Sequence, residues 1–121
     1  MRGGALCLLL AAAPALATPS DTPARAPRLS DNHDVQCAAF WAGYGIAAAR
    51  LTALGDDGLS EAAIRQYRDR AIAAGADADM LDRFIAAEAD SRALMVEAYI
   101  YGGDETSREI TLRTIERCPV E

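Results

Sequence analysis

The sequence predicts an all-α fold, a small four-helix up-down bundle closed by one long-range disulfide. Apolar residues recur at helical spacing in four consecutive segments. No segment shows the alternating apolar pattern that is typical of a strand. The loops between the four segments are short, which favours antiparallel neighbours.

Residues 1–17 have the features of a secretory signal peptide. Arg2 gives a positive start, an apolar run extends from Ala5 to Leu16, and Ala15 and Ala17 form a small-x-small cleavage site. The run is shorter than the roughly 20 residues of a membrane-spanning helix. We therefore predict an exported, periplasmic protein that is not inserted in the membrane after cleavage.

A proline-rich leader is expected to follow over residues 18–30, where Pro19, Pro23 and Pro27 stand among few apolar residues. Such a composition favours a disordered linker. The helical domain is then predicted to cover residues 31–121, a length suited to one modest hydrophobic core.

The charge balance narrows the classes of partner. The net charge is −6, with a sequence pI near 4.7, and loss of Arg2 with the signal peptide would make it −7. An acidic protein repels phosphate backbones and anionic lipids. We therefore expect no nucleic-acid partner, and instead a protein partner or self-association.

Removal of Cys7 with the signal peptide would leave an even pair of cysteines, Cys37 and Cys118. In an oxidising compartment such a pair predicts a disulfide. The cysteines are 81 positions apart, a spacing for which chain-entropy models give about 4.5 kcal/mol of stabilisation. A CxxC redox pair is excluded by the spacing, and a zinc site lacks further ligands.

The first helix is expected to begin near Ser30 or Asp31 and to end near Leu54, before the turn 55–58. One face carries the larger apolar residues: Cys37, Phe40, Trp41, Tyr44, Ala48, Leu51 and Leu54. The opposite face carries mostly small residues: Ala39, Ala42, Gly43, Ile46 and Ala49. That face either admits a close neighbouring helix or is simply exposed, and the abundance of alanine favours exposure.

The second helix is predicted to start at Ser60 as the capping residue, with Leu59 and Ile64 as a hydrophobic staple, and to stop at Gly75. Its expected buried stripe is Ile64, Tyr67, Ala71 and Ala74.

The third helix, over residues 77–103, is predicted to be the central one, because apolar residues cover more than half of its circumference. One apolar arc comprises Met80, Phe84, Ala87, Ser91, Leu94, Met95 and Ala98. A second comprises Ile85, Ala89, Val96 and Ile100. Two arcs imply neighbours on more than one side.

The fourth helix is expected to run from an Asp104 cap to Cys118, with Thr111 and Ile115 on the side of the cysteine. It would span about 21 Å, whereas the third helix would span about 39 Å. Cys118 would then stop short of the bundle end. We therefore expect either a bend at 91–92 in the third helix or a steeply crossing fourth helix.

Two clusters could suggest metal binding. His33 lies in the run 31–34, whose four consecutive residues cannot all face one ion and are explained by capping. Asp77, Asp79 and Asp82 lack the central Gly and distant Glu of a calcium loop. We therefore predict no metal and no cofactor.

Glu88 and Arg92 are the most informative polar pair, since both lie within the broad apolar arc of the third helix, one turn apart. They form either an internal ion pair, which costs desolvation, or an exposed i,i+4 pair worth a few tenths of a kcal/mol.

The aromatic residues, at helical spacing, are typical of a core, although they could also line a ligand pocket. Neighbouring Tyr99 and Tyr101 point to different faces of the third helix, so at least one is expected to be exposed. The end of this helix is therefore the candidate partner surface.

No catalytic arrangement stands out. A Ser-His-Asp triad would depend on the single histidine, and no nucleophile elbow, covalent-haem motif or phosphate loop occurs. We predict a non-enzyme, without catalytic residues.

The first functional hypothesis is an exported, non-enzymatic module for protein interaction or assembly. The second is an acid- or stress-responsive periplasmic chaperone. The general plan of a small exported helical domain with one long-range disulfide resembles acid-stress chaperones of the bacterial periplasm, in architecture only. The third is a helical bundle that binds a small molecule in an aromatic-lined cavity between helices.

Overall fold

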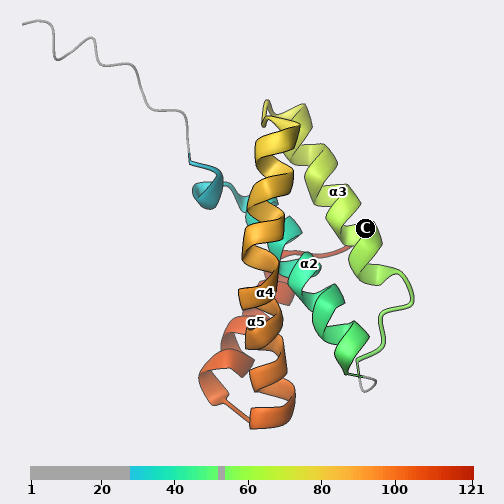
Figure 1. The fold of residues 1–121 in the computed structure, drawn as a ribbon, viewed down its shortest axis with the longest axis vertical. Coiled ribbons are helices and arrows are strands. Elements are labelled where there is room, and N and C mark those ends of the chain that lie inside the picture. Colours follow the sequence, from blue (N-terminus) through green and yellow to red (C-terminus); the bar gives the residue numbers. More distant parts are fainter. Residues whose placement is uncertain (1–27, 52–53) are drawn as a thin grey trace, which may run out of the picture.

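The computed structural model describes residues 28–51 and 54–121, and in these ranges the chain is all-α without strands (Figure 1). A short 3-10 helix and four α-helices follow one another: η2 (Leu29–Asp31), α2 (His33–Arg50), α3 (Leu59–Ala73), α4 (Ala78–Gly102) and α5 (Glu105–Arg117). The predicted fold class is confirmed. The predicted signal peptide and residues 18–27 of the predicted leader lie outside the described residues.

The packed domain begins slightly before residue 31. Leu29, inside the predicted leader, is half-buried against the core and lies in η2. The first helix ends at Arg50 rather than near Leu54. Leu51 takes up an extended backbone (φ −113°, ψ 103°) and stays buried, so it ends the helix while remaining in the core.

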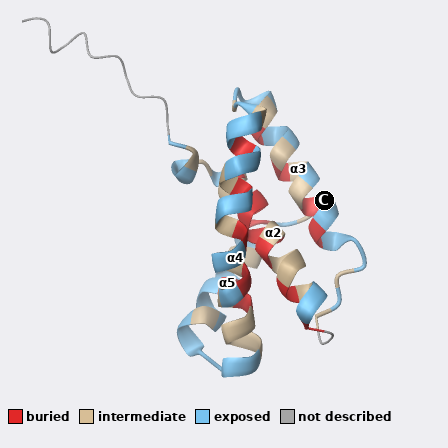
Figure 2. Cartoon of the chain, in the orientation of Figure 1, coloured by how far each residue is buried: buried red, intermediate tan, exposed pale blue. Residues whose placement is uncertain are grey.

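The central helix is α2, which packs against η2, α3, α4 and α5. The prediction that residues 77–103 form the central helix is therefore wrong. The buried residues of α2 lie all around its axis: Val35, Cys37, Ala38, Ala39, Phe40, Trp41, Gly43 and Ala47. Figure 2 shows these buried residues concentrated where α2 lies between α3 and α4. In α4, by contrast, burial is confined to one stripe.

The small-residue face of α2 packs closely against α4 at Gly43, so the close-approach alternative holds there, while Ala42 and Ile46 are half-buried and only Ala49 is exposed. Ala39 and Gly43 are buried. A Cβ atom at Gly43 would overlap the Cβ of Arg92 and lie 2.8 Å from the carbonyl oxygen of Ala89. The absence of a side chain lets the two helix backbones approach closely.

Three helix starts are capped by side chains. At the start of α2 the cap is Asn32, the residue after the predicted Asp31, and its Oδ1 accepts the amide of Val35 at 3.1 Å. Asp77 and Asp104 accept the amides three residues ahead of them, at 2.9 Å and 2.8 Å, at the starts of α4 and α5. These bonds satisfy backbone donors that the helix itself leaves free.

The start of α3 differs from the prediction. The helix begins at Leu59 after Gly58, which has a left-handed backbone (φ 83°). Ser60 is not the cap, because its amide and hydroxyl both donate to the carboxylate of Asp56, at 2.7 Å and 2.6 Å. Ala74, predicted in the buried stripe, is exposed because it follows the end of the helix.

The four helices alternate in direction, as predicted, and Figure 1 shows α2 crossing α4 obliquely near the middle of its length. The helix α5 returns along α4 (Figure 1), and Cys118 at its end lies beside Cys37 of α2, with 5.4 Å between their Cα atoms. The oblique crossing therefore brings Cys37 within reach of a short α5, which accounts for the length mismatch.

Candidate functional site

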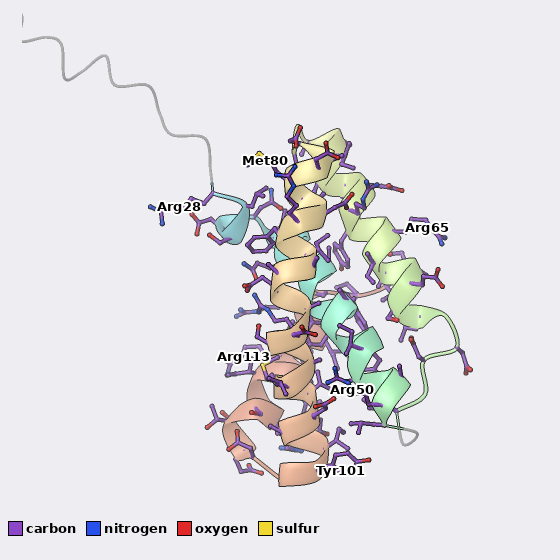
Figure 3. All side chains as sticks on the ribbon, viewed as in Figure 1. Arg28, Arg50, Arg65, Met80, Tyr101 and Arg113 are labelled. Atoms are coloured by element: carbon purple, nitrogen blue, oxygen red, sulfur yellow. A yellow bond between two sulfur atoms is a disulfide. The ribbon has the colours of Figure 1, made fainter. Side chains whose placement is uncertain are left out.

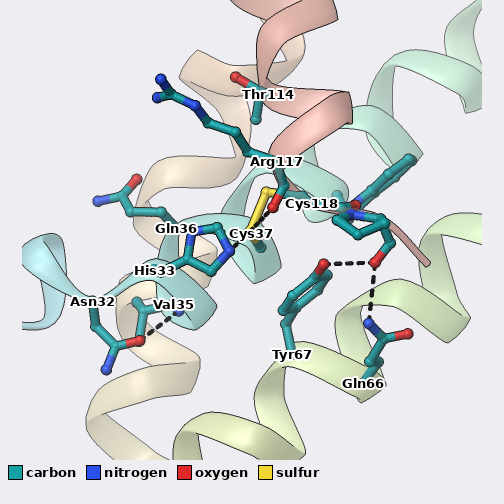
Figure 4. The surroundings of a disulfide bond; sticks show 12 residues. Asn32, His33, Val35, Gln36, Cys37, Gln66, Tyr67, Thr114, Arg117 and Cys118 are labelled. Atoms are coloured by element: carbon teal, nitrogen blue, oxygen red, sulfur yellow. Dashed lines mark hydrogen bonds between the residues drawn. A yellow bond between two sulfur atoms is a disulfide. The ribbon is translucent and has the colours of Figure 1, made fainter. Parts of the chain in front are cut away.

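The predicted disulfide joins Cys37, one turn into α2, to Cys118, the residue after α5 (Figure 4). The two Cα atoms are 5.4 Å apart, and both residues are buried. Thr111 and Cys118 are buried and Ile115 is half-buried, as the sequence indicated.

Beyond the disulfide, the C-terminal segment crosses to α3 and is held there by hydrogen bonds. The indole N–H of Trp41 donates to the carbonyl of Cys118 at 3.0 Å. The carbonyl of Pro119 accepts from the hydroxyl of Tyr67 at 2.6 Å and from the amide of Gln66 at 3.1 Å (Figure 4). Burial raises the pKa of the Tyr67 phenol, so it remains a donor across the physiological range.

A pocket of about 350 Å³ opens beside the disulfide, between the start of α2 and the end of α5. It is lined by polar and sulfur-bearing residues: Asp31, His33, Gln36, Cys37, Arg92, Thr114, Arg117 and Cys118. The Nε2 atom of His33 lies 3.5 Å from the sulfur of Cys37. The lining contains no Phe, Trp or Tyr. The aromatic residues Phe40, Trp41 and Tyr67 are instead buried in the core.

The predicted pair Glu88 and Arg92 is formed at the edge of this pocket, with 3.1 Å between carboxylate and guanidinium. The side chains are 38% and 27% exposed, so the pair is half-buried. Arg92 also donates to the side-chain oxygen of Gln36 at 2.6 Å. Gln36, on α2, therefore helps to fix the orientation of the Arg92 guanidinium group.

Of the two tyrosines proposed as a partner surface, Tyr101 is 72% exposed and Tyr99 is half-buried. Met80 and Leu94 are also strongly exposed, at 57% and 61%. The first predicted apolar arc of α4 is therefore covered only in part: its exposed members are Met80, Ala87, Ser91 and Leu94, and its half-buried members are Phe84, Met95 and Ala98. The helices α2 and α5 pack against α4. The buried residues of α4 lie on its other side: Leu81, Ile85, Ala89, Ala93 and Val96.

The acidic residues considered for calcium have structural roles. Asp77 caps α4, and Asp82 pairs with Arg68 of α3 at 2.8 Å. Among residues 28–51 and 54–121, no three His, Cys, Asp or Glu side chains gather closely enough to hold a metal ion. In the same ranges, no helix is long and apolar enough to cross a membrane.

Gln36, Thr114 and Arg117 line the pocket but carry no motif in the sequence. The one available signal is their position, since Gln36 precedes Cys37 and Arg117 precedes Cys118. Once two cysteines are paired, the residues beside them must also lie close together. Arg92, which α4 contributes to the same pocket, does not neighbour a cysteine in the sequence, so this signal does not place it there.

Comparison of the chain with protein-family models, with curated proteins and with solved structures finds no match.

Proposed function

We propose that the protein is an exported, non-enzymatic assembly module that pairs with a second copy of itself through α4. The observation that carries the proposal is an uncovered apolar stripe on this helix. Met80, Ala87, Leu94 and Tyr101 recur every seven residues, and all four are exposed. Figure 3 places Met80 near one end of α4 and Tyr101 near the other.

The spacing of this stripe suits a partner helix. Phe84, Ser91 and Ala98 lie four residues after Met80, Ala87 and Leu94, so that apolar or small residues alternate at spacings of four and three. This is the seam along which two helices interlock. From Met80 to Tyr101 it would extend about 32 Å. We name these seven residues the outer stripe.

An antiparallel second copy is the occupant that the side chains favour. In that arrangement Met80 faces Ala98 of the other copy, and Ala87 faces Ser91, so that the large Met80 meets a small residue and the helices approach closely. Arg83, beside the stripe, makes no ion pair within the described residues and would face Glu97. Glu97 is already held by Arg50 at 3.1 Å and would be shared.

The test is sedimentation equilibrium of the oxidised chain without residues 1–17. We expect dimers that dissociate in Leu94→Glu, because a charge would be buried in the seam. Ile110→Glu is the matched control, because Ile110 is an exposed apolar residue on α5, outside the stripe. A wild-type chain that stays monomeric at all concentrations, or equal effects of both variants, would refute self-association.

The acid-responsive chaperone is a second candidate, favoured by two carboxylates. Hydrogen bonds from Arg68 and from Ser107 hold the pKa values of Asp82 and Asp104 below the ordinary value. Both therefore stabilise the fold only while ionised, and their support is lost as the pH falls through these pKa values. Suppression of client aggregation at about pH 3, absent at neutral pH, is the expected sign of this function.

A further inference from the structure

The pocket beside the disulfide carries more basic than acidic side chains in an otherwise acidic protein. The chain has a net charge of −6, yet the pocket lining includes two arginines and a histidine against one carboxylate, that of Asp31. Figure 4 shows the side chains of His33, Gln36 and Arg117 arranged around this side of the disulfide. Its volume of about 350 Å³ lies within the range of small-ligand sites.

The two guanidinium groups differ in how many partners within the protein already accept their hydrogen bonds. Arg92 uses one nitrogen, Nη2, for both Glu88 and Gln36, which leaves its other N–H groups free of partners among the described residues. Arg117 makes no ion pair with any described carboxylate. Arg92 is therefore held in place by two partners, whereas Arg117 has no ion pair among the described residues.

Two of the remaining polar side chains already donate to backbone carbonyls, and the carboxylate of Asp31 is the acidic group of the lining. The amide of Gln36 donates to the carbonyl of Ser30 at 2.6 Å, and the hydroxyl of Thr114 donates to the carbonyl of Ile110 at 2.7 Å. Gln36 also accepts from Arg92, so its role is to hold that side chain in place. The donors that remain for a ligand are those of the two arginines and the imidazole, together with the second N–H of the Gln36 amide.

We infer that this pocket binds a small anion through a carboxylate or phosphate group, with Arg117 as the principal cation and Arg92 as the oriented second one. Guanidinium groups match the planar donor geometry that both kinds of anion accept. His33 adds a ring N–H donor next to the disulfide. The volume leaves room for an organic part beyond the anionic group.

The inference is tested by amide and arginine side-chain NMR of the oxidised chain, titrated with sodium phosphate and, separately, with sodium acetate. Ionic strength is held constant with sodium chloride, since screening alone shifts exposed charges. We expect saturable shifts at the first turns of α2 and the last turn of α5. The anion that saturates the shifts at the lower concentration shows whether phosphate or carboxylate is preferred.

The variant Arg117→Gln should weaken binding about tenfold or more, because it removes a charge-assisted hydrogen bond. Arg113→Gln, one turn earlier on the same helix and outside the pocket lining, is the matched control and should leave affinity unchanged. Thermal unfolding of both variants checks that the fold is intact. A linear response to both anions, or equal losses in the two variants, would overturn the inference.

Discussion

Gly43 sets how closely the two longest helices approach. A Cβ atom at this position would lie 2.8 Å from the carbonyl oxygen of Ala89 and 2.8 Å from the amide nitrogen of Ala93, both on α4. Backbone atoms of a packed helix cannot move aside as the end of a flexible side chain can. The close contact of α2 and α4 therefore depends on this one residue.

We predict that Gly43→Ala destabilises the protein by about 1–3 kcal/mol, the usual cost of overfilling a packed core. The better helix propensity of alanine, worth up to about 1 kcal/mol, offsets only part of this cost. Urea unfolding measures the change. Gly102→Ala is the control, since a Cβ there meets nothing within 4 Å. Equal stability of the two variants would contradict the close packing.

The burial of Gly43 also shows where sequence reasoning reaches its limit. A face of Ala and Gly residues has little apolar area, so its pattern fits either a tight helix contact or a solvent-exposed surface. Residues such as Phe40 and Tyr67 carry much more apolar area, and both are buried as a core pattern indicates. Whether small residues are buried depends on which helix packs against them.

At the scale of elements, the sequence predicted the four helices and the Asp104 cap of the last one, because capping and helix-ending residues act locally. It did not predict which face of α4 is covered. Both apolar arcs of α4 satisfy helical periodicity, and only the tertiary arrangement buries Leu81 and Ile85 while leaving Met80 and Leu94 exposed. These exposed residues are what the proposed pairing would bury.

The start of α5 is predicted to be sensitive to acid. The side chain of Asp104 accepts the amide of Ser107, and hydrogen bonding to Ser107 lowers the pKa of Asp104. A depressed pKa means that the cap stabilises the folded state above the ordinary carboxyl pKa, and that this contribution disappears as the pH falls through the folded value. The last helix should therefore open more readily in acid.

Asp104→Asn tests this expectation, because asparagine caps a helix without titrating. Hydrogen exchange of α5 amides should depend less on pH in Asp104→Asn than in the wild type as the pH falls below about 4. Glu105→Gln is the control, since Glu105 lies in the same turn but accepts no hydrogen bond from the described residues. The same pH dependence in wild type and Asp104→Asn would contradict the role of the cap.

For the molecule as a whole, the C-terminal end depends on few contacts. The helix α5 packs mainly against α4, with a smaller contact to α2. Beyond it, the terminal residues reach α3 through Pro119, and Glu121 pairs with Arg70 at 2.7 Å. The disulfide is the covalent link that holds α5 and this terminal segment to the central helix.

We therefore predict that the double variant Cys37→Ser, Cys118→Ser loses up to about 4.5 kcal/mol of stability, the chain-entropy value for a closed loop of this length. The double variant is preferable to a single one, because a lone thiol could form intermolecular disulfides. Urea unfolding of the wild type with and without reductant gives the same quantity independently. Because the cysteines, 81 positions apart, close a loop that contains most of the helix contacts, the loss should appear as one cooperative shift of the whole transition. Unchanged midpoints in both experiments would show that noncovalent contacts alone hold α5 in place.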